Sequence, residues 1–312
     1  MKKYFYTLLT AATLLTMAAC SQMEDLLFGG SQRAEQVSFA ISTAQVQSRT
    51  AGDGNTVDQV HYEVWDKITG QLVVSSITGV NGGAPVEMLK GHASVRLNLV
   101  RGVPYDIAFW AHNEQDTAYD ISDGLENITV KPEIMANKES YDAFCQTMTD
   151  YRIGAGTTQV ELTRPFAQVN IGTALADWQK ALDLEVMINL STVTVSGVAN
   201  VFDARLGKAS GNASLTYLLN DVLPETFEVE GDDYKYLGMN YMLADGEKTL
   251  HSLSITLYDG EKRVNTLRVN NMPIRRNWRT NIVGNLLTSK EEFKVVIEPG
   301  FTADKNGPFE MK

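Results

Sequence analysis

The residue types that most often perform chemistry in proteins are spread thinly along this sequence. The four histidines, His61, His92, His112 and His251, stand far apart, and none has the spacing of the zinc-binding H-E-x-x-H motif. No G-x-S-x-G segment is present to carry a nucleophilic serine, and the glycine-rich segment at 79–85 lacks the lysine and hydroxyl residue of a phosphate-binding loop. We therefore expect no catalytic residue, no bound metal and no cofactor.

Acidic residues are abundant, and several gather in one segment. The stretch HNEQDTAYDISDGLEN at 112–127 lacks the ligand spacing of an EF-hand loop, which favours a solvated loop over a calcium site. The chain has 38 acidic residues in all, and the sequence gives no distance between any two of them. A carboxylate pair suited to glycoside hydrolysis therefore stays open as a distant alternative.

Three aromatic residues could form a platform on which a sugar ring stacks. Tyr62 and Trp65 lie in one alternating segment, and Trp110 lies in another. Aromatic side chains in alternating strands usually belong to the core or to cross-strand pairs. The pattern therefore favours packing over sugar binding.

Cys20 has the clearest chemical setting of any residue in the chain. It closes the segment MKKYFYTLLTAATLLTMAAC, which has two lysines, an apolar run short for a transmembrane helix, and small residues at its end. This order is typical of a secretory signal, here residues 1–19. The ending TMAAC resembles the lipobox of bacterial lipoproteins, in which the cysteine receives acyl chains such as palmitate and becomes the mature N-terminus. We expect Cys20 to anchor the protein in the outer membrane through a lipidated tether over 20–34.

The charge and cysteine content of the mature chain limit its partners. The formal net charge is −11, and removal of Lys2 and Lys3 with the signal makes it −13. An exported protein this acidic would repel phosphate groups, so we expect no nucleic-acid partner. Once Cys20 is acylated, Cys145 is left without a disulfide partner in the chain, and we expect it to be a small buried hydrophobe.

Arg49 is the only charged residue within residues 36–52. Before it lies a segment whose apolar residues alternate with polar or small ones, the period of a strand with one buried face. That alternation runs through Val37, Phe39 and Ile41. After it, a Gly-Asp-Gly-Asn turn signal leads into a second alternating segment at 57–66. Arg49 thus lies on an exposed connection between two strands, where a trypsin-like protease would cut.

Most of the remaining chain alternates in the same way. Segments such as 93–100, 103–113 and 252–260 read as strands, and turn signals such as NGGAP and YDGEK separate them. Many short strands at this spacing predict a mostly β fold of antiparallel β-sandwiches with few short helices.

Two segments are helix candidates. The stronger is TALADWQKAL at 173–182, with Thr173 as the N-cap and Leu175, Trp178 and Leu182 at helical spacing. The weaker is SYDAFCQTM at 140–148.

The length of 312 residues allows two domains, each with a core of its own. Around residue 162 the sequence becomes LTRPFAQVNIGT, where Pro165 interrupts one alternating run before another begins. We place the boundary there, which gives an N-terminal β-sandwich domain over 35–162 and a C-terminal β-sandwich domain over 163–312.

Several of these features together resemble one protein family. The lipobox at Cys20, the alternating strand, the lone Arg49 and the segment VHYEVWD at 60–66 resemble the N-terminal part of the fimbrillin (Mfa-like) family, the subunits of type V pili. The junction segment LTRPFAQVNIGT and the segment MPIRRNWRTNIVGNLLTSKEEFKVVIEPGF at 272–301 resemble the same family. The likeness therefore covers nearly the whole mature chain.

The resemblance implies two transthyretin-like β-sandwich domains in a lipoprotein precursor. In the family, an extracellular arginine-specific protease cuts after an arginine that follows the first strand. Arg49 stands in that position, so the mature chain would begin at Thr50. Loss of the strand that carries Val37, Phe39 and Ile41 would leave a groove, which a C-terminal strand of another subunit is thought to fill. The matching donor strand alternates through Phe293, Val295 and Ile297.

What the resemblance implies is a structural or adhesive pilus subunit with no enzymatic activity, at the cell surface or in the fimbrium. Its partners would be other pilus subunits in a homo- or hetero-polymer, the protease, the outer membrane through the lipid anchor, and a host protein or glycan. The alternative is a surface-anchored glycan-binding lipoprotein that is neither cut nor polymerised. The segment at 291–301 also fits an ordinary last strand that pairs within its own domain.

Overall fold

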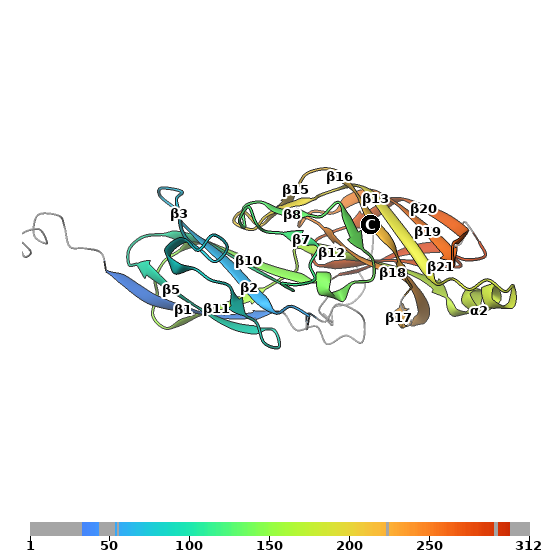
Figure 1. The fold of residues 1–312 in the computed structure, drawn as a ribbon, viewed down its shortest axis with the longest axis horizontal. Helices are drawn as coiled ribbons and strands as arrows, with labels where there is room; N and C mark the ends of the chain where they lie inside the picture. Colours follow the sequence, from blue (N-terminus) through green and yellow to red (C-terminus); the bar gives the residue numbers. More distant parts are fainter. Residues whose placement is uncertain (1–32, 44–53, 55, 223–224, 290–292, 300–312) are drawn as a thin grey trace, which may run out of the picture.

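The structure is a computed structural model of the chain, and it describes residues 33–43, 54, 56–222, 225–289 and 293–299. The described residues form 22 strands, β1 to β22, with one α-helix and two short 3-10 helices. Figure 1 shows an elongated molecule, with β1, β2 and β5 in one half and the helix α2 at the opposite end. The predicted mostly β fold is confirmed.

Two sheets face each other in the half that contains β1. One has the order β11-β1-β5, and the other has the order β10-β6-β2-β3 with β4 paired to β2. Their facing side chains form one apolar cluster, which draws its members from residues 37 to 162. The strands are β1 (Ala34–Thr43), β2 (Gln59–Asp66), β3 (Leu72–Ser75), β4 (Val86–Glu87), β5 (His92–Val100), β6 (Tyr105–His112), β10 (Ala143–Tyr151) and β11 (Thr157–Leu162).

Two five-stranded sheets make up most of the other half. Their orders are β17-β18-β12-β21-β22 and β20-β19-β13-β16-β9. Ile171 and Gly238 on the first sheet face Val193 on the second, so the core of this half lies between them. The strands are β9 (Glu133–Met135), β12 (Phe166–Ala174), β13 (Leu190–Val198), β16 (Ala213–Asp221), β17 (Thr226–Val229), β18 (Asp232–Leu243), β19 (Thr249–Asp259), β20 (Lys262–Ile274), β21 (Trp278–Gly284) and β22 (Phe293–Pro299).

The two halves are joined by more than the chain at residue 162. A four-stranded sheet combines β7 (Tyr119–Asp120) and β8 (Ile128–Val130) with β14 (Val201–Asp203) and β15 (Lys208–Ser210), and β9 pairs with β16. The second apolar cluster accordingly includes Trp65 and Trp110. The division of the chain at residue 162 stays a prediction.

Most strand pairs are antiparallel, as predicted, but three pairs between described strands are parallel. These are β1 with β11, β12 with β21, and β16 with β9. Alternation within a strand does not show the direction of its neighbours, so the sequence could not indicate them.

The predicted helix at 173–182 is present as α2 (Leu175–Asp183), but its predicted details are wrong. Its N-cap is Ala174, and the hydroxyl of Thr173 donates a hydrogen bond to the Asp177 carboxylate. The helix buries Asp177 and Ala181, while Leu175 and Leu182 are 45% and 38% exposed. The hydrogen bonds of the Asp177 carboxylate therefore orient the helix, rather than burial of Leu175 and Leu182.

The weaker predicted helix at 140–148 is wrong. The chain forms a 3-10 turn at Glu139–Tyr141 and then β10, which pairs along its length with β6. Pairing with a buried neighbour outweighs local helix propensity here. Cys145 lies within β10, is 1% exposed as predicted, and burial raises the pKa of its thiol to about 11.

Candidate functional site

The first strand, β1, occupies the centre of its sheet. It pairs antiparallel with β5, with Val37 opposite Leu97 and Phe39 opposite Val95, and parallel with β11 on its other side. The side chains of Val37, Phe39 and Ile41 are 5%, 0% and 1% exposed. The alternation that predicted a strand with one buried face is therefore confirmed.

The inner face of β1 is packed against the opposite sheet. The Phe39 ring lies 5.5 Å from the Phe109 ring and 5.1 Å from the Tyr151 ring, measured between centroids. Removal of β1 would leave β5 and β11 with unpaired backbone groups facing each other across an apolar gap. The side chains along that gap include Val95, Leu97, Val160 and Leu162, all buried.

A bidentate ion pair closes the N-terminal end of β1. Arg101, just after β5, donates from Nε and Nη2 to the two carboxylate oxygens of Glu35 at 2.7 and 2.6 Å. These hydrogen bonds from Arg101 lower the pKa of Glu35. No sequence motif indicated this pair, because 66 residues separate its members.

The predicted processing residues lie outside the described residues. This holds for Cys20, for Arg49 and for Thr50. The first described residue after β1 is Gly54, whose backbone has a φ of +78°. Gly54 approaches Phe144 so closely that a Cβ atom there would lie 2.9 Å from the ring. The segment that carries Arg49 therefore runs between a central strand and a tightly packed glycine.

The predicted donor strand, β22, lies at the edge of its sheet in the other half of the molecule. Among the described strands it pairs only with β21, antiparallel, with Phe293 opposite Gly284, Val295 opposite Ile282 and Ile297 opposite Thr280. These three side chains are only half-buried. In the intact chain, β22 thus adopts the alternative of a last strand paired within its own sheet. Its use as a donor stays a prediction.

Two of the histidines meet, which the sequence did not indicate. His61 and His112 lie on neighbouring strands, and both direct Nε2 at the Oε2 atom of Glu114, at 2.9 and 3.4 Å. These three are the only group of potential metal ligands among the described residues, with ligand atoms within 4.8 Å of one another. The pairing of β2 with β6 brings these residues together. Their spacing in the sequence does not indicate that they are close in space.

The hydrogen bonds around this cluster fit a metal ion poorly. The Trp110 indole N–H donates to Nδ1 of His112 at 3.0 Å, so the neutral imidazole carries its proton on Nε2 and can donate it to Glu114. A metal-binding histidine normally coordinates through one nitrogen and donates its other N–H to an acceptor. Among the described residues neither ring has such an acceptor, because Nδ1 of His112 itself accepts from Trp110 and Nδ1 of His61 is buried without a hydrogen-bond partner. The cluster is better suited to holding the end of β6 in place.

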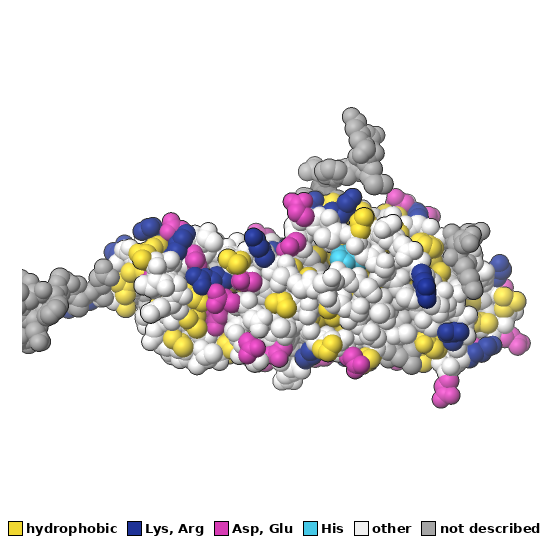
Figure 2. Space-filling view, turned by 90° about the horizontal axis from the view of Figure 1, so that it is seen from above, with side chains coloured by type: hydrophobic (Ala, Val, Ile, Leu, Met, Phe, Trp, Pro, Cys, Tyr) yellow, Lys and Arg dark blue, Asp and Glu magenta, His cyan; other side chains and the backbone are white. Residues whose placement is uncertain are grey.

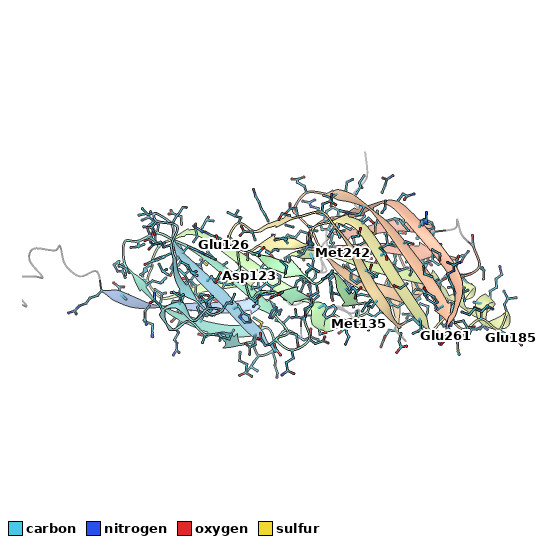
Figure 3. All side chains as sticks on the ribbon, turned by 45° about the horizontal axis from the view of Figure 1, so that its top comes forward. Asp123, Glu126, Met135, Glu185, Met242 and Glu261 are labelled. Carbon is cyan, nitrogen blue, oxygen red and sulfur yellow. The ribbon has the colours of Figure 1, made fainter. Side chains whose placement is uncertain are left out.

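The other candidates from the sequence have structural roles. Tyr62, Trp65 and Trp110 are buried, so they pack the core and cannot stack a sugar at the surface. In the acidic segment, Asp116 pairs with Lys138, and Glu126 pairs with Arg205. Figure 3 places Asp123 and Glu126 near each other over the middle of the molecule, far from Glu185 and Glu261 beside α2.

The exposed surface is also free of a large single-sign patch on the face seen in Figure 2. Acidic and basic side chains are scattered there, and uncharged polar side chains and backbone cover much of the face between them. No helix among the described residues is long and apolar enough to span a membrane.

Comparison with solved structures finds fimbrial proteins among the similar folds. The tip fimbrial protein Mfa3 from Porphyromonas gingivalis, in a C-terminally truncated form, is 10% identical, with 85% of this chain and 99% of that chain covered and a TM-score of 0.46. A fimbrial assembly protein from Parabacteroides distasonis is 13% identical, with coverages of 85% and 96% and a TM-score of 0.42. A Bacteroides thetaiotaomicron protein whose description proposes polysaccharide binding is 14% identical, with coverages of 84% and 95% and a TM-score of 0.49.

No curated protein matches the sequence. The model of one family, described as a family of unknown function (DUF6562), matches residues 31–310, and the chain belongs to that family.

Proposed function

We propose that this chain is a structural or adhesive subunit of a cell-surface pilus that is exported as an outer-membrane lipoprotein, cut after Arg49 and assembled by strand exchange. The observation that carries the proposal is the position of β1. It is a buried central strand that pairs with a neighbour on each side, yet a single connection joins it to the rest of its sandwich. Arg49 lies on that connection.

A cut after Arg49 would leave β1 held by non-covalent contacts alone. Its departure would expose the backbone edges of β5 and β11 together with the apolar side chains beneath them. Both kinds of exposed group favour the capture of a new strand, which supplies ladder hydrogen bonds and buried side chains. Each fully buried side chain of this size contributes roughly 1.5 to 3 kcal/mol.

The donor in this proposal is β22 of another subunit. As an edge strand it gives up one ladder when it leaves its own sheet, whereas in the groove it would lie between two. Its half-buried Phe293, Val295 and Ile297 would become fully buried there. The exchange therefore increases both hydrogen bonding and apolar burial for the same strand.

The remaining parts of the proposal follow from the sequence. Acylated Cys20 would hold the precursor in the outer membrane at the cell surface until an arginine-specific protease releases it. The partners of the mature subunit would be other pilus subunits, and an adhesive subunit would also bind a host protein or glycan. The two proposed domains, 35–162 and 163–312, would serve as acceptor and donor.

The N-terminal sequence of the protein extracted from the cell surface tests the proposal. We expect a chain that begins at Thr50, and we expect Arg49→Ala to abolish it while Arg33→Ala leaves it unchanged. A start at Ala34 would keep β1 in place and defeat strand exchange. An intact chain that begins at acylated Cys20 would favour the unprocessed glycan-binding lipoprotein instead.

A further inference from the structure

The ion pair at the start of β1 has a counterpart in the sequence of the C-terminal strand. Along β1, Glu35 precedes three alternating apolar residues, and the pattern is acid-x-apolar-x-apolar-x-apolar. Residues 291–297 repeat this pattern, with Glu291 in the place of Glu35. The apolar positions are also filled by the same three residue types, in the order Val, Phe, Ile along β1 and Phe, Val, Ile along the C-terminal strand.

Departure of β1 would take away the carboxylate that Arg101 binds. Arg101 donates two hydrogen bonds to Glu35, and its one other hydrogen bond in the described residues is a 3.5 Å contact to the carbonyl oxygen of Ile153. The guanidinium would then stand at the mouth of the open groove without its two shortest hydrogen bonds. A strand that enters with a carboxylate at the position of Glu35 would restore both.

The burial pattern of β1 distinguishes the possible ways to thread the donor. In the direction of β1 and with Phe293 at the position of Val37, the three apolar residues fall on buried positions and Glu291 falls beside Arg101. If the donor were shifted by two residues toward the C-terminal end of the β1 position, Glu291 would fall at the buried position of Val37. Burying an unpaired carboxylate is costly, so this register is disfavoured.

The reversed direction is disfavoured for the same reason. With Ile297 at the position of Val37, the alternation would carry Glu291 to the position of Thr43, which is 7% exposed. Pro299 would then fall at the position of Glu35 and bring no charge to Arg101. One threading therefore satisfies both the apolar gap and the guanidinium.

We propose that Arg101 sets the direction and register of the incoming strand by binding Glu291 of the donor subunit in place of Glu35. This inference rests on the proposed strand exchange and names the contact that selects the partner. The partner is a second copy of this chain, whose residues 291–297 repeat the acidic and apolar pattern of β1. Charge pairs at an interface act in this way, since they fix register and exclude wrong partners more than they add affinity.

A charge-exchange experiment tests this inference on the full chain. The wild type, Arg101→Glu, Glu291→Lys and the variant with both changes are treated with an arginine-specific protease, which does not cut after lysine, and polymer formation is followed by gel and size exclusion. We expect each single reversal to slow assembly roughly fivefold or more, since it places like charges together. The double variant should recover most of the wild-type rate. Glu292→Lys is the matched control, because residue 292 would occupy the position of Gln36, which is exposed, and this variant should assemble normally.

A second arm separates failure of this inference from failure of the proposed function. A labelled synthetic peptide of residues 289–299, with Glu291 or with lysine in its place, is titrated against cut wild-type and cut Arg101→Glu chains. We expect the peptide to bind at least about fivefold more tightly when residues 101 and 291 have opposite charges than when they have like charges. If the wild type assembles but charge reversal and its compensation change nothing, the role of Arg101 is wrong and strand exchange stands. If the wild type neither assembles nor binds the peptide, both proposals are wrong.

Discussion

The buried carboxylate of Asp177 accepts a 2.8 Å hydrogen bond from the backbone N–H of Leu287, which lies 110 residues further along the chain. The same carboxylate accepts hydrogen bonds from the backbone N–H and the hydroxyl of Thr288, and from the hydroxyl of Thr173 at 2.7 Å. Helix α2 is thereby tied to the segment that leads from β21 toward β22. The C-terminal strand consequently has a fixed base just before residue 289.

Asp177→Ala should lower the free energy of unfolding by about 2 to 4 kcal/mol, because several buried donors lose their acceptor together. Asp183→Ala is the matched control on the same helix, and its exposed side chain should change stability by no more than about 0.5 kcal/mol. Urea unfolding of the two variants checks the difference. Equal effects would mean that the carboxylate does not hold this segment.

Acid should destabilise the fold through the histidine cluster. Burial, with the nearby His61 as a second cause, lowers the pKa of His112 from 6.5 to about 4, and burial also lowers the pKa of His61. The folded state therefore favours neutral imidazole rings. The nearby carboxylates of Glu114 and Asp58 raise the pKa of His112, but by less than burial and His61 lower it. The stabilisation is complete above about pH 6.5 and is lost as the pH falls toward 4.

The size of this effect follows from the shift. A lowering from 6.5 to about 4 corresponds to about 2 to 3 kcal/mol of stability lost in acid for His112. Unfolding free energies measured between pH 7 and pH 4 check it. His112→Asn keeps an acceptor near the position of Nδ1 for the Trp110 indole but cannot titrate, so its stability should depend less on pH over this window. An unchanged pH dependence in that variant would show that His112 is not the titrating group.

Cys20→Ala should release the protein from the membrane fraction, because the acyl chains proposed on Cys20 are the anchor. Ser21→Ala, next to it, should leave fractionation unchanged. Separation of membrane and soluble fractions of the producing cells checks both variants. Continued membrane association of Cys20→Ala would refute acylation at this residue.

The strands were largely predictable because their signal is local. The alternation through Val37, Phe39 and Ile41 reports one buried face, and the structure places all three in the core. The pairing of strands could not be predicted in the same way, because nothing within a strand shows which neighbour it pairs with or in which direction. The parallel pairing of β1 with β11 and the pairing of β9 with β16 therefore could not be derived from the sequence.

The candidate site shows the same division. The sequence indicated the strands β1 and β2 and the lone arginine between them, since these features depend on residues close together in the chain. The pair of Glu35 with Arg101 and the cluster of His61, His112 and Glu114 depend on pairing between distant strands. The predicted N-cap at Thr173 was wrong because its hydroxyl is used by Asp177, an interaction that the helix pattern alone does not reveal.

An inter-subunit disulfide test bears most directly on the central claim that the C-terminal strand of one subunit enters the groove of another. Lys294→Cys is combined in separate variants with Ser94→Cys, Arg96→Cys or Asn98→Cys, all exposed positions, the last three along the edge strand of the opened groove. Cys145 is buried and should not interfere. We predict that the cut chains form disulfide-linked multimers under oxidising conditions, most strongly with Arg96→Cys, which lies opposite Ser38 in the intact chain. Absence of multimers in all three variants, or equal multimers in chains that were never cut, would contradict strand exchange.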